Sequence, residues 1–423
     1  MVYSAWGRGV LSVFLVFCLL IFLVPCASGL GFTEAIRQSE VYSAQIQAAH
    51  ASIIADQASI VAAGSLPDPK VYTGVSNIPV SNAPGSSAFS TGQESMSMGV
   101  VGISQELPNT AKRQAERRQA IALADQQQAQ LQLTRLNLFS ETAQAWVNRY
   151  YAEKRLTILQ TQEKENSLLV ALVDKAVATG RRTASDALDA RLDSEEVQNQ
   201  LEQASGEWKS SIERLCRWIG PMGREPLSGR IPAWSMQAQD LELHLEHHPD
   251  LLLANANIQW AKAHVQAAEA DKKPDWGVDL AYEHRGPAYA DMISLSVTLS
   301  LPVFQQSRQG PRLRAAEENL SSAQDQLLDM RREHLAALKA DIEQFNALSS
   351  QIDRIMQKSE PLAQQKIELL LGEYQHGSAT IEQLLLGRKQ LRQLQLLCIS
   401  LETQRDLLMA RLRYQYSQED SRS

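Results

Sequence analysis

Hydrophobic and polar residues alternate without interruption along one stretch in the second half of the chain. Every second position from Ile293 to Leu301 is apolar, and the positions between them are serine or threonine. A period of two predicts a β-strand with its apolar side chains on one face and its hydroxyl groups on the other. A similar alternation runs from Trp276 to Glu283, and turn-forming residues connect the two segments. The pattern therefore predicts a β-hairpin over residues 276–301.

The apolar face of this hairpin needs an apolar environment. A sheet of a soluble protein, with its other face in water, is one interpretation. The rest of the chain is mostly helical in pattern, however, and offers no separate sheet on which the apolar face could pack. A lipid bilayer is the second interpretation, because strands of about 9–11 residues are long enough to cross it. The predicted lipid-facing residues are then Ile293, Leu295, Val297, Leu299 and Leu301.

A second pair of strands is predicted in the first half of the chain. Lys70–Ser76 and Ser95–Leu107 have strand-like composition, and a loop rich in serine, glycine and proline separates them. The alternation of the longer strand slips at Val100 and Val101, so its apolar face is undetermined. A β-bulge at this point is one interpretation. Together the two strands predict a further hairpin over residues 70–107.

Most of the remaining chain has the pattern of long helices. Residues 109–178 contain neither proline nor glycine, which predicts one helix about 105 Å long at 1.5 Å per residue. A second long run covers residues 309–376, with Gly310-Pro311 and Pro361 as candidate kinks. The shorter helices are predicted over residues 31–64, 184–218 and 240–273 and, after Gly377, up to Tyr416.

The order of these elements is repeated. Leu66-Pro67-Asp68 leads into the first hairpin as Lys273-Pro274-Asp275 leads into the second, and a glycine turn follows each long run. In each half the two shorter helices add up to the length of the long one, which predicts one continuous helix beside two stacked shorter ones. The predicted organisation is a first structural repeat over residues 30–218, an inter-repeat linker over 219–239, a second repeat over 240–416 and a polar tail over 417–423.

Residues 1–29 have the pattern of a secretory signal peptide. Arg8 supplies a positive charge, residues 10–24 are almost all apolar, and small residues precede a cleavage point after Gly29. Cys26 half resembles the cysteine of a lipoprotein signal, but a proline precedes it where a small residue is expected. The signal predicts export and leaves lipidation of the cysteine open.

Charge and motifs argue against several classes of function. The formal net charge is −7 at pH 7, which does not favour binding of nucleic acid. The sequence contains no nucleophile elbow, phosphate-binding loop or zinc signature. We therefore expect neither an enzyme nor a bound cofactor.

The predicted strands are too few to close a membrane sheet within one chain. Outer-membrane barrels of a single chain have at least 8 strands, and unpaired strand edges are not tolerated in lipid. Four strands per chain therefore predict an oligomer, in which two chains would supply eight strands and three would supply twelve.

Five short motifs follow one another along the chain. They are Leu66-Pro67-Asp68-Pro69, Gln105-Glu106-Leu107-Pro108, His248-Pro249-Asp250-Leu251, Ser300-Leu301-Pro302-Val303-Phe304 and Tyr374-Gln375-His376-Gly377. In this order, and from about Phe32 to Tyr416, the sequence resembles the TolC family of outer-membrane efflux proteins. The first motif, together with Asn77-Ile78-Pro79, is most similar to the CzcC-type branch, which serves heavy-metal efflux.

The resemblance implies a fold that is mainly α with a small β part. Duplicated long-helix hairpins and two β-hairpins per chain would form, in a homotrimer, a trimeric α-barrel and a β-barrel of twelve strands. The implied function is the channel of a tripartite efflux system of the RND type, in the outer membrane and extending into the periplasm. Its implied cargo is heavy-metal cations or other small solutes.

The resemblance also implies partners and leaves one alternative. The partners would be further copies of the chain, outer-membrane lipid, a periplasmic membrane-fusion adaptor and an inner-membrane pump, with no nucleic acid. The alternative is a periplasmic coiled-coil adaptor or scaffold of an export system. Such a protein would also be exported and helical, but one helical hairpin beside a β-rich domain is expected for it.

The two glycine turns are the candidate sites for adaptor docking and gating. Glycine permits the positive φ that a tight reversal between helices requires. The predicted docking residues are Thr179, Gly180, Arg181, His376, Gly377 and Ser378. The predicted gate residues are Arg181, Arg182, Asp186, Asp189 and Glu382. Charges repeated around a narrow rim can hold neighbouring chains together or select cations, whereas carboxylates that only complement their own helix dipoles are the simpler interpretation.

Three histidines at the start of the second repeat are weak candidates for metal binding. His244, His247 and His248 lie close together in sequence, and imidazoles three or four residues apart can share one face of a helix. A solvated helix end without a metal is the favoured interpretation.

Overall fold

The computed structural model describes residues 29–82, 88–89, 96–232 and 238–416. The predictions for residues 1–28, including Cys26, and for the polar tail lie outside the described residues. The chain divides into two compact units, here called the sheet unit and the tip unit. The sheet unit comprises Ala44–Asn137, Met236–Ala340 and Gln415–Ser423, and the tip unit comprises Met1–Ser43, Leu138–Ser235 and Asp341–Tyr414.

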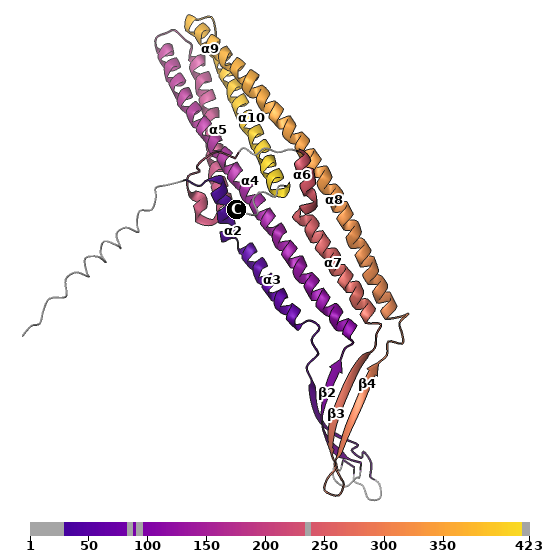
Figure 1. Cartoon of the computed structure of the whole chain (residues 1–423). Helices are drawn as coiled ribbons and strands as arrows, with labels where there is room; N and C mark the ends of the chain where they lie inside the picture. The colour runs from indigo at the N-terminus through magenta and orange to yellow at the C-terminus, as the bar shows by residue number, and fades with distance from the viewer. Residues whose placement is uncertain (1–28, 83–87, 90–95, 233–237, 417–423) are drawn as a thin grey trace, which may run out of the picture. The chain divides into compact units, whose positions relative to one another are not determined.

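Four strands of the sheet unit form one antiparallel sheet in the order β1-β2-β3-β4 (Figure 1). The strands are β1 (Lys70–Ser76), β2 (Met98–Leu107), β3 (Asp275–His284) and β4 (Met292–Ser300). The two predicted hairpins are therefore present, and pairing of β2 with β3 joins them into one sheet. The register runs through Val100 and Val101 without interruption on both sides, so β2 contains no bulge there.

The helices of the sheet unit lead to and from these strands. They are α3 (Ala44–Ala62), the first part of α4 (Thr110–Ala178), α6 (Ala238–His244), α7 (Pro249–Ala270) and most of α8 (Gln309–Arg354). Hydrogen bonds of 2.7 Å from Arg118 to Gln266 and from Gln126 to Asn257 connect α4 with α7. Among the described residues, no helix has both the length and the apolar run that are needed to cross a membrane.

The helix predicted over residues 240–273 is interrupted. A short 3-10 turn, Leu245–His247, separates α6 from α7, and His248 adopts an extended conformation with φ −61° and ψ 131°. The cause is Pro249, because a proline disfavours the helical conformation of the residue before it and is well accommodated at the first position of a new helix. The prediction of an uninterrupted helix over residues 240–273 was wrong at this point.

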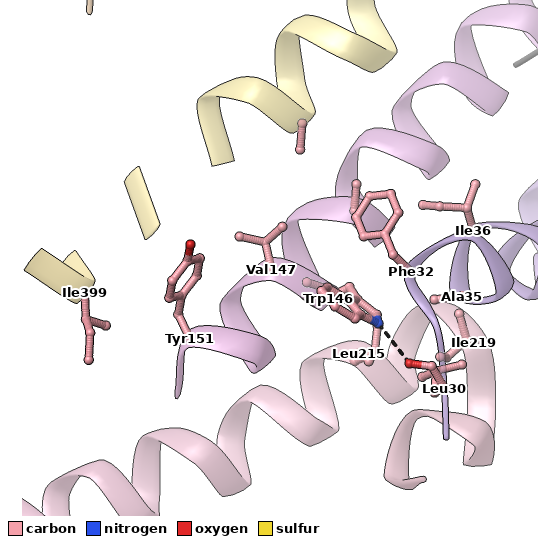
Figure 2. Packing of buried hydrophobic residues seen from close by; sticks show 13 residues of the cluster. Leu30, Phe32, Ala35, Ile36, Trp146, Val147, Tyr151, Leu215, Ile219 and Ile399 are labelled. Atoms are coloured by element: carbon pink, nitrogen blue, oxygen red, sulfur yellow. Dashed lines mark hydrogen bonds between the residues drawn. The ribbon is translucent and has the colours of Figure 1, made fainter. Parts of the chain in front are cut away.

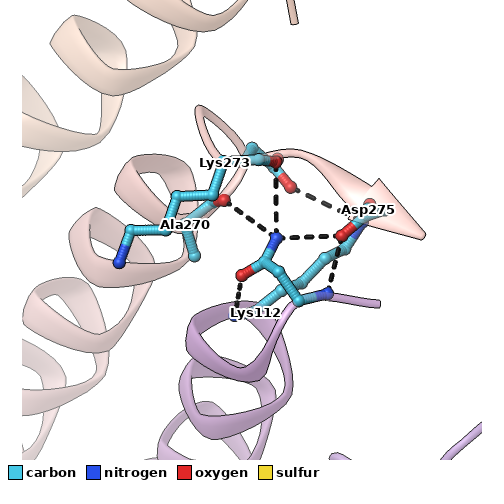
Figure 3. A network of polar contacts seen from close by, with 6 residues as sticks. Lys112, Ala270, Lys273 and Asp275 are labelled. Atoms are coloured by element: carbon cyan, nitrogen blue, oxygen red, sulfur yellow. Dashed lines mark hydrogen bonds and ion pairs between the residues drawn. The ribbon is translucent and has the colours of Figure 1, made fainter. Parts of the chain in front are cut away.

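Asn109, the residue before α4, connects that helix to the start of β3. Figure 3 shows Asp275, at the start of β3, beside Lys112 in the first turn of α4. Its backbone N–H and its side-chain amide both donate to Asp275 Oδ1, at 2.8 Å and 2.9 Å. Its side-chain oxygen accepts the N–H of Lys112 at 2.9 Å, which satisfies one of the free N–H groups at the helix start. The aspartate of the Lys-Pro-Asp motif thus fixes β3 against the first turn of α4.

The tip unit consists of helices. They are α2 (Phe32–Tyr42), the second part of α4, α5 (Ala184–Ile219), the 3-10 turn Gly220–Arg224, the end of α8, α9 (Glu360–His376) and α10 (Ile381–Tyr416) up to Tyr414. In Figure 1, α4 with α5 and α9 with α10 form two helical hairpins whose turns lie at the same end of this unit.

Aromatic and aliphatic side chains from α2, α4, α5 and α10 form the main core of the tip unit (Figure 2). Trp146 is fully buried at its centre, and the indole N–H donates to the carbonyl of Leu30 at 3.4 Å. The ring of Phe32 meets that of Trp146 edge to face, with centroids 5.4 Å apart, which is a favoured aromatic geometry. This core holds the segment before α2 against the middle of α4.

Two predicted helices contain breaks for different reasons. The run over residues 31–64 is divided into α2 and α3 by Ser43, which is extended and whose N–H donates to Ser39 at 3.0 Å; no proline or glycine marks this break. The run over residues 309–376 passes from α8 through a π-helical turn, Ile355–Ser359, into α9. Pro361 follows that turn, and the wider turn accommodates the missing N–H and the bulk of the proline ring.

A buried charged network connects three helices of the tip unit. Arg392 of α10 lies 3.1 Å from Asp193 of α5, and the two side chains are only 4% and 9% exposed. The amide of Asn166 of α4 donates to the other oxygen of Asp193 at 2.7 Å. Because a buried charge is costly unless it is paired and hydrogen-bonded, these three residues specify how α4, α5 and α10 pack.

Candidate functional site

The register of the sheet places one apolar residue from each strand in a continuous row. Val71 lies opposite Ile103, Ile103 opposite Leu280, and Leu280 opposite Leu295. These side chains are 74%, 44%, 47% and 69% exposed, respectively. Since β-strand side chains alternate between faces, the neighbouring rows on this face contain further apolar residues, among them Val101, Tyr282, Val278, Val297, Trp276 and Leu299.

All five predicted lipid-facing residues are exposed in this structure. Ile293, Leu295, Val297 and Leu299 belong to β4, and Leu301 follows its last residue. The structure therefore brings the predicted stripe together with apolar residues of the other three strands. The face of β2 that the sequence left undetermined is settled by the register, because Val101 and Ile103 lie in the rows of Tyr282 and Leu280.

The opposite face of the sheet is polar and lined by small residues. Ser294, Ser296 and Thr298 of β4 lie opposite Ala281, Asp279 and Gly277 of β3. Gly102 lies beneath the ring of Tyr72, so that a side chain at this position would collide with the ring. The two faces differ in chemistry most clearly on β3 and β4, because Tyr72 of β1 and Val100 of β2 also lie on the polar side.

The two outer strands each have one unpaired edge. In the order β1-β2-β3-β4, β1 and β4 have a hydrogen-bonded neighbour on one side only. A strand edge exposes a row of N–H and C=O groups that can pair with another chain. Both edges of this sheet are therefore available for pairing with further strands.

The two predicted tip turns share one backbone geometry. Gly180 follows α4 with φ +70°, and Gly377 follows α9 with φ +79°, the left-handed conformation that glycine adopts without strain. The N–H of Arg181 donates to Ala176 at 2.9 Å, and the N–H of Ser378 donates to Glu373 at 2.9 Å. Each glycine thus ends a helix in a Schellman-type turn. Of the docking candidates, Thr179, Gly180, Arg181, His376, Gly377 and Ser378 are all exposed.

One arginine connects the two turns. The guanidinium of Arg182 donates to the carbonyl of Tyr374 at 2.7 Å and lies 3.9 Å from the centroid of its ring. A cation over an aromatic face is attracted by the ring electrons. Beneath this contact lies a small buried cluster from both hairpins, formed by Leu169, Val173, Ala187, Ala190, Ile381, Leu384 and Leu385. The two hairpins are therefore held together at their turns.

The gate candidates occupy different environments at this end of the tip unit. Asp186 forms a capping box with Thr183, in which each backbone N–H donates to the other residue's side chain, at 3.1 Å and 3.2 Å. The equivalent cap of α10 is formed by Thr380 with Gln383, and Glu382 is exposed beside it. Arg181 is exposed, and Arg182 and Asp189 are half-buried. Asp186 and Arg182 therefore have partners within the chain.

The histidines at the start of α7 do not share one helix face. His244 ends α6, His247 is exposed in the following turn, and His248 is turned inward and only 3% exposed. The break before Pro249 causes this separation. The side chain of His248 caps α7, since its Nδ1 accepts the N–H of Asp250 at 3.1 Å.

Two residues that the sequence analysis did not name as metal-binding candidates lie beside His248. His334 of α8 contacts Asp250, with 3.2 Å between Nε2 and Oδ2, and its ring centroid is 4.2 Å from that of His248. Burial lowers the pKa of His248 to about 4, and the proximity of His334 contributes to the decrease. The hydrogen bond from His334 lowers the pKa of Asp250. His248 is thus a neutral imidazole beside a carboxylate at pH 7.

Comparison with known proteins identifies the relatives of this chain. The model of the family described as outer membrane efflux protein matches residues 35–221 and 241–414. OpmQ of Pseudomonas putida, named a pyoverdine export outer membrane protein, is 25% identical over 289 residues, which cover 65% of this chain and 61% of OpmQ.

Solved structures share the fold. A membrane protein from Pseudomonas aeruginosa superimposes with a TM-score of 0.80 at 17% identity, covering 91% of this chain and 90% of that one. CusC, whose crystal structures concern folding and transmembrane channel formation, gives a TM-score of 0.73 at 16% identity, covering 90% and 91%. The predicted fold class, mainly α with a small β part, is confirmed.

Proposed function

Because the chain belongs to the outer membrane efflux protein family, we propose that it is the outer-membrane channel of a tripartite efflux system. Membership of the family places the protein in the outer membrane, with its helices extending into the periplasm, and makes it a transport protein rather than an enzyme. The family match covers both halves of the chain, so the alternative of a periplasmic adaptor is not retained.

The observation that carries the proposal is the exposed apolar face that crosses all four strands. Exposure to water would cost free energy along the whole row formed by Val71, Ile103, Leu280 and Leu295. Large exposed apolar patches mark a site of interaction. Lipid is the proposed environment. The unpaired edges of β1 and β4 then pair with those of neighbouring copies, and three copies close the ring of strands.

Exposed leucines on the helices of the tip unit support lateral contacts between copies. Leu168 and Leu172 of α4 are exposed four residues apart, and so are Leu188 and Leu192 of α5. This spacing places each pair on one helix face, away from the buried Leu169. In the proposed trimer these leucines lie against the helices of neighbouring chains.

We propose heavy-metal cations or other small solutes as the cargo. The motif resemblance to the heavy-metal branch favours the first class, and the name of OpmQ assigns export of pyoverdine to that relative. The two classes are separated in a host that lacks its own channel, by supplying the native adaptor and pump with this protein. Restored tolerance to metal salts supports the first class, and restored export of an organic solute without metal tolerance supports the second.

The exposed tip turns are the proposed docking site of the adaptor, and Gly377→Val is expected to abolish efflux. A β-branched residue at φ +79° costs about 1–3 kcal/mol if the turn keeps its shape, so the turn is expected to change. Nothing lies within 4 Å of the added Cβ, so the Cβ causes no clash within the chain. Export assays and cross-linking to the adaptor measure the result in cells that contain all three components.

Two variants serve as controls for this prediction. Gly377→Asn should retain docking, because asparagine tolerates the left-handed conformation. Gly372→Ala, within α9 and also without close neighbours, should behave as wild type. Normal cross-linking of Gly377→Val to the adaptor would refute docking at this turn.

The charges near the turns are the proposed gate of the channel. In three copies, Arg181, Arg182, Asp186, Asp189 and Glu382 would surround the narrow end, where pairing between arginines and carboxylates holds the resting tip closed. The contacts of Arg182 with Tyr374 and of Asp186 with Thr183 hold the turns within each chain, so opening would separate whole hairpins.

Combined replacement of Arg182 and Asp186 by alanine is expected to raise the single-channel conductance of the purified trimer. Divalent cations should also block the wild type more strongly than Asp189→Ala, because carboxylate rings attract cations. The control is Arg191→Ala. Arg191 lies farther along α5 and forms an exposed ion pair with Asp174 of α4. Unchanged conductance and block in all these variants would show that the charges are not the gate.

A further inference from the structure

We propose that His248, Asp250 and His334 bind one divalent transition-metal ion of the Zn²⁺ class in the sheet unit. One side-chain ligand atom from each of the three residues lies within 4.8 Å of the others. Asp250 Oδ2 is 3.2 Å from His334 Nε2 and 3.7 Å from His248 Nδ1. Ligands bound at 2.0–2.1 Å to a tetrahedral ion lie roughly 3.4 Å apart, so small shifts suffice to surround a cation.

The hydrogen bonding of His248 indicates which ring nitrogen can bind the cation. Its side chain is only 2% exposed, and its Nε2 has no hydrogen-bond partner. Since Nδ1 accepts the N–H of Asp250, the ring proton lies on Nε2 and the single lone pair of Nδ1 is engaged in that hydrogen bond. A cation bound at Nδ1 therefore replaces this hydrogen bond and displaces no proton.

The ligand chemistry selects the class of metal. Two imidazoles and one carboxylate suit Zn²⁺, Cu²⁺, Ni²⁺ or Co²⁺ and do not suit Mg²⁺ or Ca²⁺, which prefer oxygen ligands. Three protein ligands leave one position of a tetrahedral ion for water. We take Zn²⁺ as the representative ion.

A tyrosine supports one of the ligands from behind. The hydroxyl of Tyr416, in the last described turn of α10, lies 3.4 Å from Nδ1 of His334. When Nε2 of His334 binds a metal, Nδ1 carries the ring proton and can donate it to that hydroxyl oxygen. Outer partners of this kind orient metal-bound histidines. Tyr416 is thus a positioning residue rather than a ligand.

The bound ion would connect three parts of the sheet unit. His248 and Asp250 belong to the start of α7, His334 to α8, and Tyr416 to the end of α10. The inference goes beyond the proposed function and does not depend on the cargo of the channel.

Metal binding to the purified full-length protein tests the proposal. The protein is treated with EDTA, dialysed, and titrated with Zn²⁺ in competition with a chromophoric chelator. One ion per chain is expected in the wild type. With Co²⁺, the visible absorption of a four-coordinate ion bound by histidine should appear. Asp250→Asn and His334→Gln should each lower the Zn²⁺ affinity at least about tenfold, and Tyr416→Phe by roughly tenfold.

The matched control is the pair of histidines that the sequence suggested. His244→Ala with His247→Ala removes two imidazoles within four residues of His248 and should leave the binding and the Co²⁺ spectrum unchanged. Circular dichroism and the size of the purified assembly establish that the Asp250 and His334 variants are folded. Absence of Zn²⁺ and Co²⁺ binding in the wild type, or equal binding in folded cluster variants, would overturn the proposal.

Discussion

Arg392→Ala is expected to destabilise the tip unit by about 3–5 kcal/mol, because it leaves the carboxylate of Asp193 buried without its cation. Asn166 still donates one hydrogen bond to Asp193, but an amide does not neutralise a charge. Thermal unfolding of the purified protein, followed by the loss of helical circular dichroism, measures the change. A lower unfolding temperature and faster proteolysis of the tip are both expected.

Two further variants show whether burial causes the effect. Arg191→Ala removes an arginine of α5 that pairs with Asp174 at 3.2 Å in solvent, and an exposed pair contributes only about 0–1 kcal/mol. Replacing Arg392 and Asp193 together by leucine removes both charges and should be less destabilising than Arg392→Ala alone. If Arg392→Ala and Arg191→Ala were equally stable, the buried network would not hold the helices together.

Val297→Arg is expected to cost about 2–4 kcal/mol, the range for a cation facing lipid near the middle of the membrane. Val297 is exposed in the middle of β4, opposite Val278 of β3. The expected results are loss of the assembled protein from the outer membrane and accumulation of unassembled chains. Outer-membrane fractions, compared by gel without heating, measure the assembled form.

The adjacent residue of the same strand provides the control. Ser296 faces the polar side and lies opposite Asp279, so an arginine at 296 meets a carboxylate and should assemble far better than one at 297. Equal assembly of Val297→Arg and Ser296→Arg would contradict the lipid-facing assignment.

The strands and the long helices were predictable from local pattern alone. The strict alternation around Val297 indicates a two-faced strand, and the absence of proline and glycine over residues 109–178 favours a single helix. The bounds of β1 agree with the prediction, and α4 begins one residue later than predicted, at Thr110. Such features depend on residues that are neighbours along the chain, so a single sequence is enough to predict them.

Contacts between distant segments were not predictable in this way. Ser43 ends α2 without a proline or glycine nearby, and His248 meets His334 across 86 positions of sequence. The contact of Arg182 with Tyr374 depends on how two helical hairpins pack. The break at His248 did have a local signal, because the following Pro249 disfavours helix at the residue before it.

Cross-linking between the outer strands tests the central claim, closure of the sheet by three copies, most directly. Cysteine is placed at Thr73 of β1 and, in separate variants, at residue 293, 295 or 297 of β4, in a background without the native cysteines. Within one chain two strands separate β1 from β4, at about 4.8 Å per step, so a disulfide between them must join different copies. Oxidation in the outer membrane should give bands of one, two and three chains and none larger for at least one pair. Absence of cross-links at every pair, or a ladder that continues beyond three chains, would contradict a closed trimer.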